Sequence, residues 1–328
     1  MRVVVVGGGP AGATTARFLR RGGVEVLLIQ EERKRPKPCG GGVKRTLFPQ
    51  FGVPEGVVEK WIEKGVLHFK GNVVEVELEG ELGIVERGRF DRLLRELAAE
   101  EGVKPIPGRV VKGGREKGRF WVEVRRGEER ERVEGDVLVG ADGVHSTIRK
   151  LFLSQKVPAV MTYFQTTPLP LRFAHFHFDR EEGGDYYGWA FPHREGGHIG
   201  STTPQLLQNL SRIYPSPSPV KGFPIPLWDP SLPMEKDGVF FVGDAAGQVL
   251  PTTFEGIYYA MVSGQILAEA LLSGESYSKL WNRRLGRRFK FFKTLEKGVT
   301  GPLRFPLLSL FKLKLYRQFV VNFWKRSS

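Results

Sequence analysis

Continuous apolar runs alternate with amphipathic stretches at the start of the chain. Val3–Val6 and Val26–Ile29 are fully apolar, as expected of strands that are covered on both faces of a parallel sheet. The residues between them, "GGGPAGATTARFLRRGG", predict a glycine turn followed by a helix. Together these segments predict a βαβ unit with a right-handed crossover.

The middle of the chain predicts strands around two helices. A short helix is expected over residues 57–64. An amphipathic helix follows, in which one face holds Phe90, Leu93, Leu94 and Leu97. Strands are expected in "VLHFK", "NVVEVELEG" and "LGIVER" before that helix, and in "VKPIPGRVVKG", "GRFWVEVRRG" and "ERVEGDVLVGADG" after it.

A change of pattern near residue 157 predicts a second domain. Four aromatic-rich strands, "VMTYF", "PLRFAHFHFD", "YYGWAFP" and "HIGSTT", precede the helix "PQLLQNLSRIY" and a proline-rich linker. The segment "GVFFVGDAAG" then returns to the α/β pattern, and a helix and a helical tail follow. The sequence therefore predicts an α/β fold (α+β overall), in which a Rossmann-type domain carries an inserted antiparallel-sheet domain.

The expected domain boundaries follow from these changes of pattern. The discontinuous nucleotide-binding domain is expected over 1–65, 87–157 and 233–275, and the substrate-binding sheet domain over 66–86 and 158–232. Residues 276–328 are expected to form a basic amphipathic helical tail.

The composition limits the class of protein. The chain has 328 residues, 41% of them apolar, and a single cysteine, which excludes an internal disulfide framework and favours a reducing compartment. No secretory signal is apparent, and no run approaches the roughly 18–20 apolar residues of a spanning helix. The chain has few Cys and Met and many Lys, Arg and Glu, which is a pattern found in thermophiles. We expect a cytoplasmic protein.

Positive charge is concentrated near the C-terminus. Residues 277–328 hold fourteen Lys and Arg against one acid, Glu296, which gives +13 of the net charge of +14. Phe, Leu and Trp interleave with these cations, so we expect peripheral attachment to an anionic membrane surface, apolar side down. The alternatives are a helix packed on the core and nucleic-acid binding, although no nucleic-acid-binding fold is apparent.

The first glycine turn predicts a dinucleotide site. Gly7, Gly9 and Gly12 have the spacing G-x-G-x-x-G between a strand and a helix, where they permit a tight turn, the approach of a pyrophosphate and close helix packing. The helix N-terminus at Pro10 and Ala11 would face the phosphates with free N–H groups.

Polar residues follow the other strands at the same edge of the predicted sheet. Gln30 stands where an acid is expected to bind ribose, so the ligand is Gln30 or, after a shift of one residue, Glu31. Asp142 follows a strand in "GADG", where it is a ligand residue or only a turn residue. Gly243 and Asp244 follow a third strand, and for Asp244 a role in binding is favoured.

The stretch "RPKPCGGGVK" contains the single cysteine, Cys39. Glycines 40–42 leave room for backbone close to a flat ligand, and Pro36 and Pro38 limit the freedom of the loop. We expect the Cys39 thiol to face that ligand. The alternative is a small buried residue in a turn, with no chemical role.

Alternate residues of one predicted strand form an aromatic face. Tyr187, Trp189 and Phe191 point the same way, which suits a flat apolar pocket wall, although an ordinary aromatic core has the same pattern. His175 and His177 also share a face, but no further ligand is apparent, so no metal site is expected.

The motifs "GGGPAG", "GADGVHSTIR" and "GDAAGQVLPTTFEGI" occur in an order that resembles the flavoproteins of the p-hydroxybenzoate hydroxylase superfamily. Within it, "PKPCGG" (Pro36–Gly41) and "YGWAFP" (Tyr187–Pro192) are similar to the geranylgeranyl reductases. The resemblance covers about residues 1–275. It implies FAD, bound in extended form across the junction of the two domains, and reduction of isoprenoid double bonds.

The resemblance also implies site residues. Arg87 matches an arginine of the family at the head of a helix, and Val111 is expected to give a main-chain contact to adenine. Phe254 stands where the family usually has glycine and is expected to line and reshape the substrate pocket. The implied FAD contacts are Gly7, Gly9, Pro10, Ala11, Gly12, Gln30, Glu31, Cys39, Gly40, Gly42, Arg87, Val111, Asp142, Gly243, Asp244, Gly256 and Ile257.

The expected reaction is transfer of a hydride from reduced flavin N5 to one alkene carbon of a prenyl lipid, with a proton added to the other. Cys39, Tyr187 and Trp189 are the expected catalytic residues, and the pocket is expected to hold Phe191 and Phe254 as well. The electron donor is expected to be NAD(P)H or a ferredoxin-like carrier. The alternatives are a flavin monooxygenase or halogenase on an apolar substrate, and a non-catalytic flavin- or lipid-binding protein.

Overall fold

The computed structural model describes residues 1–32, 37–178, 186–301 and 303–326. The chain divides into two compact units, each built from three segments. Unit 1 comprises Met1–Arg35, Asp91–Ala159 and Ile225–Phe291, and unit 2 comprises Pro36–Phe90, Val160–Pro224 and Phe292–Ser328. Within the described part of the chain, no helix is long and apolar enough to cross a membrane.

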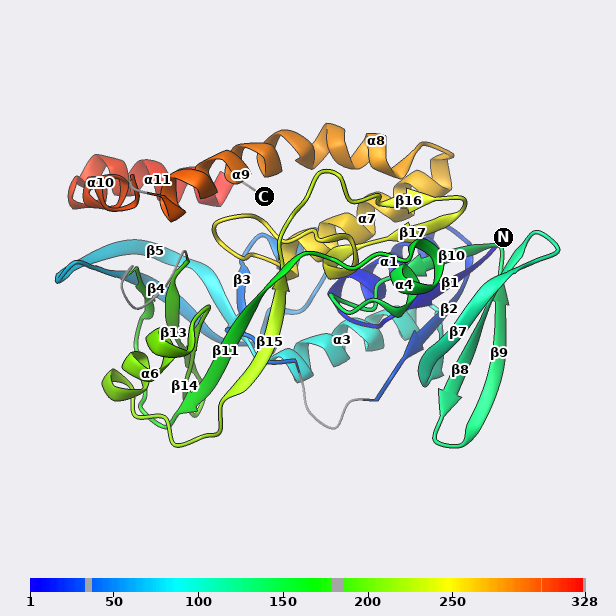
Figure 1. The fold of residues 1–328 in the computed structure, drawn as a ribbon, viewed down its shortest axis with the longest axis horizontal. Helices are drawn as coiled ribbons and strands as arrows, with labels where there is room; N and C mark the ends of the chain where they lie inside the picture. Colours follow the sequence, from blue (N-terminus) through cyan, green and yellow to red (C-terminus); the bar gives the residue numbers. More distant parts are fainter. Residues whose placement is uncertain (33–36, 179–185, 302, 327–328) are drawn as a thin grey trace. The chain divides into compact units, whose positions relative to one another are not determined.

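A six-stranded sheet forms the centre of unit 1 (Figure 1). Five strands are parallel, and the two-residue strand β16 is antiparallel at one edge. The order of the strands is β16 (Glu235–Lys236), β17 (Val239–Phe241), β10 (Val137–Gly140), β1 (Arg2–Val6), β2 (Glu25–Gln30) and β6 (Lys104–Pro107). The central strands β1 and β10 are buried on both faces, as their apolar runs predict.

Helices and a small sheet cover the central sheet of unit 1. Helices α1 (Pro10–Arg21) and α7 (Ile257–Ser273) pack closely, because Gly264 faces the backbone of Ala11 and a Cβ there would lie 2.6 Å from the Ala11 carbonyl oxygen. A three-stranded sheet packs through Phe120, Val122 and Val133 on Val4, Leu138 and Phe241. Its strands, drawn in green in Figure 1, are β7 (Arg109–Glu116), β8 (Arg119–Arg126) and β9 (Glu129–Gly135), and helix α4 (Thr147–Leu153) packs beside β7.

Unit 2 is built on an eight-stranded, mostly antiparallel sheet. The pair β12–β4 is parallel. The order of the strands is β15 (Lys221–Pro226), β11 (Ala159–Thr167), β14 (Gly196–Ser201), β13 (Gly188–His193), β12 (Ala174–His177), β4 (Val58–Phe69), β5 (Asn72–Val85) and β3 (Gly42–Lys44).

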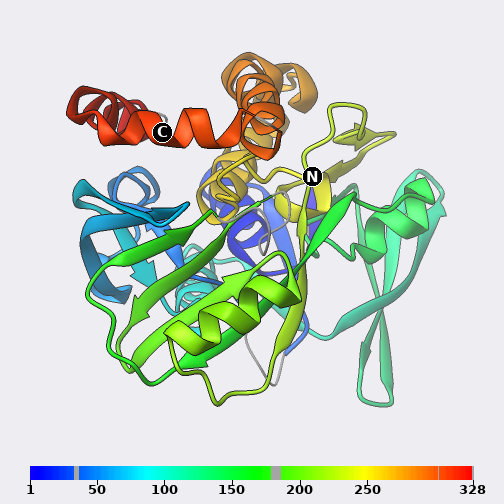
Figure 2. The ribbon, with the colours of Figure 1, turned by 60° about the vertical axis from the view of Figure 1, so that its left-hand side comes forward.

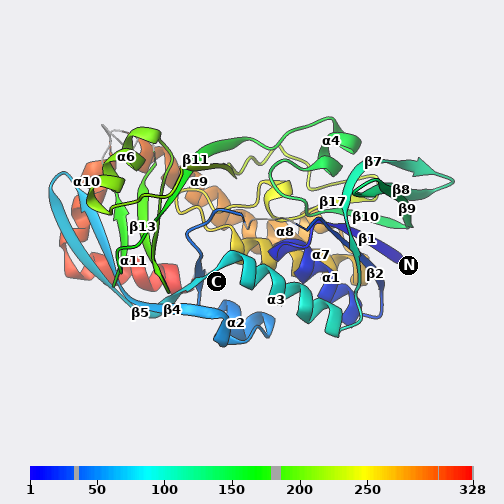
Figure 3. The same ribbon diagram turned by 90° about the horizontal axis from the view of Figure 1, so that it is seen from below.

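Different helices pack on the sheet of unit 2 through two clusters. Helix α6 (Pro204–Ile213) lies across β13 and β14 (Figure 2) and contributes Leu206, Leu207 and Leu210. Helices α10 (Arg304–Ser309) and α11 (Lys314–Arg326) lie beside β4 and β5 (Figure 3), where Leu308 and Val321 pack on residues such as Phe69. Further short elements are α2 (Leu47–Phe51), η1 (Glu55–Val57), η2 (Gly243–Ala246) and η4 (Leu310–Lys312).

The structure confirms the fold class and corrects local predictions. The segments "VKPIPGRVVKG" and "ERVEGDVLVGADG" each hold two strands, and "NVVEVELEG" and "LGIVER" together form the single strand β5. The helix that we expected over 57–64 is wrong, because residues 58–64 begin the long strand β4. Register shifts between Val58 and Lys60 and between Ile62 and Lys64 interrupt the alternation of the strand, so its apolar spacing imitates a helix. The proline-rich linker contains the edge strand β15, a position where proline is tolerated.

The segment expected to form a tail is built into both units. Helix α8 (Tyr277–Trp281), the π-helical turn η3 (Asn282–Gly286) and the start of α9 (Arg287–Thr300) bury Tyr277, Trp281 and Phe289 in unit 1. Residues from 292 onward belong to unit 2, as do residues 36–65, which we expected in the nucleotide-binding domain. The functional boundaries between the domains stay a prediction.

Candidate functional site

The first glycine turn leaves space where a pyrophosphate would approach. Gly7 has φ of +104°, and a Cβ at Gly12 would lie 1.8 Å from the Gly7 carbonyl oxygen, so both positions require glycine. A Cβ at Gly9 would meet nothing within 4 Å, so this glycine faces open space. Helix α1 begins at Pro10 without a side-chain cap and without an acid in its first turn. These features fit the diphosphate of a dinucleotide.

Two side chains hold Gly8 of this turn in place. The Gly8 N–H donates to Oε1 of Gln30 at 2.5 Å, and Nη1 of Arg95 donates to the Gly8 carbonyl oxygen at 3.1 Å. The Gln30 amide therefore shapes the turn, and its predicted contact with ribose stays a prediction, as does that of the exposed Glu31. Sequence reasoning missed Arg95, because it lies on the polar side of the amphipathic helix α3 (Arg87–Glu100), as a solvated cation would.

The acid of the second glycine turn, Asp142, is hydrogen-bonded to groups of its own turn and of the helix that follows. Asp142 accepts hydrogen bonds from Oγ of Ser146 (2.5 Å) and from the N–H groups of Thr147 and Ile148 (2.6 and 3.2 Å), so it caps helix α4. Burial raises the pKa of Asp142, and these hydrogen bonds oppose that shift. Its role as an FAD ligand stays a prediction.

Arg149, in the same motif, joins the second turn to the third. Its Nε donates to the carbonyl oxygen of Ala245 at 2.7 Å, and its Nη2 donates to the carbonyl oxygen of Pro233 at 3.0 Å. The guanidinium also lies 4.2 Å from the ring centre of Phe241. Burial lowers the pKa of Arg149 to about 10, which leaves the side chain charged at neutral pH.

The third turn meets two helix N-termini within unit 1. Gly243 has φ of +59°, and a Cβ there would lie 2.8 Å from Cβ of Ala11 at the start of α1. A Cβ at Gly256 would lie 3.8 Å from Oδ1 of Asp244, so this carboxylate lies beside the residue that precedes α7 and Ile257. Helix α7 also begins without a side-chain cap. The arrangement brings together the first and third motifs, and it suits an acidic, phosphate-containing cofactor with hydroxyl groups.

The predicted FAD contacts of Val111 and Arg87 stay a prediction. Val111 lies in β7 at a register shift between Val110 and Lys112. Arg87 is the first residue of α3, whose N-terminal N–H groups at Gly88 and Arg89 are bound by the carboxylate of Glu86 (2.7 and 2.6 Å).

Phe254 adopts a backbone conformation that glycine adopts more easily. Its φ is +56°, in the left-handed region, and its N–H donates to the carbonyl oxygen of Leu250 at 3.1 Å. This agrees with the expectation that Phe254 replaces a glycine. Its place in the substrate pocket stays a prediction.

The cysteine loop of unit 2 lies against aromatic side chains. A Cβ at Gly40 would lie 2.8 Å from the Phe191 ring and 3.0 Å from Nε1 of Trp189. Gly41 has φ of +77°, and a Cβ there would lie 2.2 Å from the Val85 carbonyl oxygen. The Cys39 thiol is half-buried. Gly40 and Gly41 are therefore required for close contact between the loop and the rest of unit 2. Pro36, which opens the "PKPCGG" motif, lies outside the described residues.

The aromatic face predicted in β13 exists and extends beyond the strand. Tyr187 lies 6.0 Å from Trp189 between ring centres, and Phe191 lies 5.3 Å from Phe176. Gly200, opposite Trp189 on β14, makes room for the indole, since a Cβ there would lie 2.2 Å from the ring. We call Tyr187, Trp189 and Phe191 the aromatic wall; the residues that sequence reasoning missed beside it are Phe164, Phe176 and Phe178.

The C-terminal helices of unit 2 hold the residue that precedes the wall. Trp324 of α11 packs against the same buried cluster as Phe176 and Phe191. The buried Glu296 accepts a hydrogen bond from the Tyr186 hydroxyl at 2.9 Å, and the guanidinium of the buried Arg304 donates to the Tyr186 carbonyl oxygen. The predicted tail is therefore also a structural support of the wall.

Three histidines stack on the other side of this sheet. The rings of His68 and His177 lie 4.2 Å apart between centres, and Nε2 of His68 lies 3.0 Å from Nδ1 of His175. Nε2 of His177 lies 3.1 Å from the Tyr214 hydroxyl. Because the rings stack, their nitrogens do not converge on one point. Within the ranges that the structure covers, no cluster of three or more His, Cys, Asp or Glu side chains could hold a metal ion.

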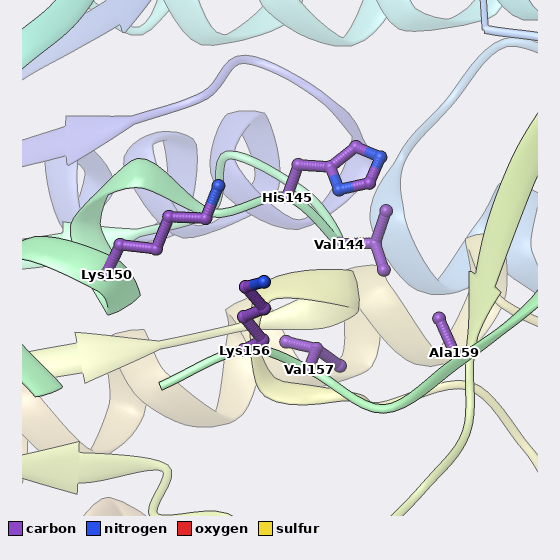
Figure 4. A pocket seen from close by; sticks show the side chains of 6 residues that line it. All are labelled: Val144, His145, Lys150, Lys156, Val157 and Ala159. Carbon is purple, nitrogen blue, oxygen red and sulfur yellow. The ribbon is translucent and has the colours of Figure 1, made fainter. Parts of the chain in front are cut away.

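A pocket of about 320 Å³ lies in unit 1 next to the second glycine turn (Figure 4). Three of its lining side chains carry nitrogen: His145, Lys150 and Lys156. All three are exposed. None of the predicted site residues lines this pocket.

Comparison with known proteins places these features in context. A family model described as "FAD binding domain" matches residues 1–217. The chain is 33% identical over 311 residues to geranylgeranyl diphosphate reductase of Rhodobacter capsulatus, covering 86% of this chain and 78% of the relative. It is 28% identical over 343 residues to digeranylgeranylglycerophospholipid reductase of Methanocaldococcus jannaschii, covering 90% of this chain and 86% of the relative.

Solved structures agree on the fold. A geranylgeranyl bacteriochlorophyll reductase-like protein from Thermoplasma acidophilum superposes with a TM-score of 0.82 at 21% identity, covering 95% of this chain and 90% of the other. The p-nitrophenol 4-monooxygenase of Pseudomonas putida gives 0.77 at 17% identity, covering 99% and 98%. At these identities the structural likeness supports the fold alone.

Proposed function

The chain belongs to the geranylgeranyl reductase family of FAD-dependent oxidoreductases, and we propose that it saturates carbon–carbon double bonds in the isoprenoid chains of membrane lipids. The aromatic wall carries the proposal. A prenyl chain offers carbon and no charge. The half-buried rings of Tyr187 and Phe191 lie on one face beside the cysteine loop, and the buried Trp189 backs them. The named relatives act on geranylgeranyl groups, which agrees with such a wall.

FAD fits the observed turns of unit 1. The open space at Gly9, the uncapped start of α1 and the carboxylate of Asp244 beside Gly256 would hold its diphosphate and hydroxyl groups. When bound and reduced, this cofactor supplies a hydride.

The residues of unit 2 would position the alkene and provide the proton. An unactivated double bond has no carbonyl to polarise, so the wall must fix the chain and a nearby acid must protonate the second carbon. The half-buried Cys39 thiol and the Tyr187 hydroxyl are the proposed acids, and Trp189, which is only 5% exposed, is proposed to contact the reacting segment through its edge near Gly40. Two electrons per bond must then return to the flavin from NAD(P)H or a ferredoxin-like carrier.

An anaerobic incubation tests the reaction. The purified protein, loaded with FAD and reduced chemically, is mixed with a geranylgeranyl glycerophospholipid, and the lipid is analysed by mass spectrometry. We expect a mass gain of two hydrogens per reduced bond and oxidation of the flavin. A product that forms only with oxygen and carries a hydroxyl would instead indicate a monooxygenase. Flavin that stays reduced beside unchanged lipid would indicate a non-catalytic binding protein.

We also propose that unit 2 docks on an anionic membrane surface through α10, η4 and α11. Leu315 and Phe319 are 82% and 65% exposed and are four residues apart, so they form one apolar stripe on α11. Lys312 and Lys314 are exposed next to this stripe. Each cation near anionic lipid contributes about 1 kcal/mol, and inserted apolar side chains add to this. Trp324 on the same helix packs against the buried cluster of the sheet on which Phe191 also packs.

Point substitutions test the docking better than removal of the tail, because the tail supplies buried core residues. The double variant Leu315→Ser, Phe319→Ser should lose most binding to vesicles that contain phosphatidylglycerol. Ile213→Ser is the matched control. Ile213 is an apolar residue with a comparable exposed fraction of 58%, but it lies at the end of α6, away from α10 and α11. Unchanged sedimentation of the double variant with the vesicles would reject the docking surface.

A further inference from the structure

Two histidine side chains bind successive carbonyl groups of the cysteine loop in unit 2. Nδ1 of His198, on β14, lies 3.2 Å from the carbonyl oxygen of Cys39. Nε2 of His193, at the end of β13, lies 3.3 Å from the carbonyl oxygen of Gly40. A carbonyl oxygen only accepts hydrogen bonds, so each of these ring nitrogens must carry a proton.

Glu59 fixes the orientation of His193. Its Oε2 lies 2.7 Å from Nδ1 of His193, and the two side chains are only 13% and 7% exposed. A carboxylate also only accepts, so His193 satisfies both neighbours in its doubly protonated form. The ion pair with Glu59 therefore supports the N–H group that His193 directs at Gly40.

His198 completes the arrangement as a neutral ring. The centres of the His193 and His198 rings lie 3.6 Å apart. Burial, and secondarily the charge of His193, lowers the pKa of His198 to about 4, so its single proton lies on Nδ1 and faces Cys39. Lys221 also lowers this pKa, whereas Glu59 and the hydrogen bond to the Cys39 carbonyl raise it.

The contacts leave the loop little freedom to shift. The Gly41 N–H points at Sγ of Cys39 at 3.4 Å, and Gly40 lies against Phe191 and Trp189 with no room for a Cβ. Nε1 of Trp189 is buried and has no hydrogen-bond partner among the described residues, so an unused donor lies at the same glycine. His193, His198 and Phe191 lie on the same face of the sheet, because Phe191 pairs with His198 and is two residues from His193, and the loop packs on that face.

We infer that His193 and His198, with Glu59 behind His193, are positioning residues that fix the Cys39 thiol for proton delivery. The inference rests on the proposed reduction of isoprenoids. Neither imidazole contacts the reacting atoms; each acts through a carbonyl group of the loop. If either donor is lost, the loop can move and the thiol becomes both more accessible and less well aligned.

The single cysteine of the chain provides a direct test. In the full-length, FAD-loaded protein, the rate of alkylation of Cys39 by N-ethylmaleimide reports the accessibility of the thiol without any need for turnover. His198→Leu removes the donor, whereas His198→Asn keeps an N–H group near the position of Nδ1. We expect alkylation to accelerate at least about threefold in His198→Leu and to stay within about twofold of wild type in His198→Asn.

Further variants separate positioning from general loss of structure. Glu59→Gln should also accelerate alkylation, because it removes the charge that supports His193. His175→Asn, in the histidine stack on the other face of the same sheet, should not. Equal alkylation rates in His198→Leu and His198→Asn, or a wild-type rate in His198→Leu, would overturn the inference. Thermal unfolding identifies a variant that is merely unfolded. If His198→Leu is unfolded, the alkylation rate of the folded variant His198→Asn, compared with wild type, tests the inference.

Turnover provides the second readout. In the anaerobic assay, His198→Leu should lower kcat about tenfold with KM for the lipid nearly unchanged, and His198→Asn should recover most of that loss. If the wild-type protein reduces no lipid, the proposed function fails, and the alkylation rates still show whether the histidines position the thiol. If it does reduce lipid and the alkylation rates are equal, only the inference about the histidines fails.

Discussion

Nε of Arg149 donates a hydrogen bond of 2.7 Å to the carbonyl oxygen of Ala245, ninety-six residues away in the chain. The bond joins the "GADGVHSTIR" motif to the "GDAAG" motif inside unit 1. The arginine of the first motif is therefore explained by the turn of the second, which it holds in position beneath the start of α7.

Arg149→Met should show the cost of losing this connection. Arg149 is completely buried and its guanidinium binds two carbonyl groups, so its loss leaves those acceptors unpaired. We expect the free energy of unfolding to fall by about 2–4 kcal/mol, measured by urea denaturation, and FAD affinity to weaken. Arg126→Met, an exposed position on β8, is the control and should change neither quantity appreciably. Equal stability of the two variants would contradict the structural role.

Gly9→Ala should weaken FAD binding, whereas Gly12→Ala should destabilise the protein itself. At Gly9 the backbone is extended and an added Cβ meets nothing, so the apoprotein should keep its stability, while FAD affinity falls because the methyl group occupies the approach of the diphosphate. At Gly12 the Cβ would lie 1.8 Å from a carbonyl oxygen, so the apoprotein itself should be destabilised. Calorimetry without cofactor and titration of FAD fluorescence separate the two effects.

Phe254→Gly should be more stable than Phe254→Ala by about 1 kcal/mol. Both variants lose the ring, so their difference isolates the backbone, which has φ of +56° at this residue. Thermal unfolding of the pair measures the difference. If Phe254→Ala is the more stable variant, residue 254 does not require the left-handed conformation in solution.

Acid should destabilise unit 2. Burial, and secondarily the proximity of His68, lowers the pKa of His175 to about 4 and that of His177 to about 3. The unfolded chain takes up these protons near pH 6.5 and the folded protein does not, so stability should fall as the pH decreases from about 6.5 toward 4.

The dependence of the unfolding free energy on pH can be measured by denaturation at several pH values. Each such histidine contributes at most about 1.4 kcal/mol per pH unit. His177→Phe should make the dependence of the unfolding free energy on pH shallower, whereas His145→Asn, at an exposed position, should leave the slope as it is. A wild-type slope in His177→Phe would contradict the pKa shift.

The local motifs were predictable because their geometry is set by residues that are close in sequence. The turn Gly7–Gly12 and the alternation in Tyr187–Phe191 carry their own spacing, and both have the expected structure. The helix predicted over 57–64 failed because register shifts altered a strand pattern, and these depend on the partner strand β5.

Other parts of the site depend on contacts between distant segments. Arg95 supports Gly8 from 87 residues away, and Glu59 reaches His193 across 134. From the amino-acid sequence alone, Arg95 is expected to be a solvated cation on a helix, and His193 is expected only to end a strand. Only the fold turns these side chains toward the glycine turn and the cysteine loop.

The attachment of Glu296 and Arg304 to Tyr186 has a thermodynamic consequence. Both residues lie in the C-terminal helices, and Tyr186 immediately precedes the aromatic wall. A membrane that binds these helices only when they are folded stabilises the folded arrangement by the free energy of binding. The same free energy stabilises the segment at Tyr186, which the helices hold. A lipid bilayer docked on α10 and α11 would therefore also tighten the strand against which the prenyl chain is proposed to lie.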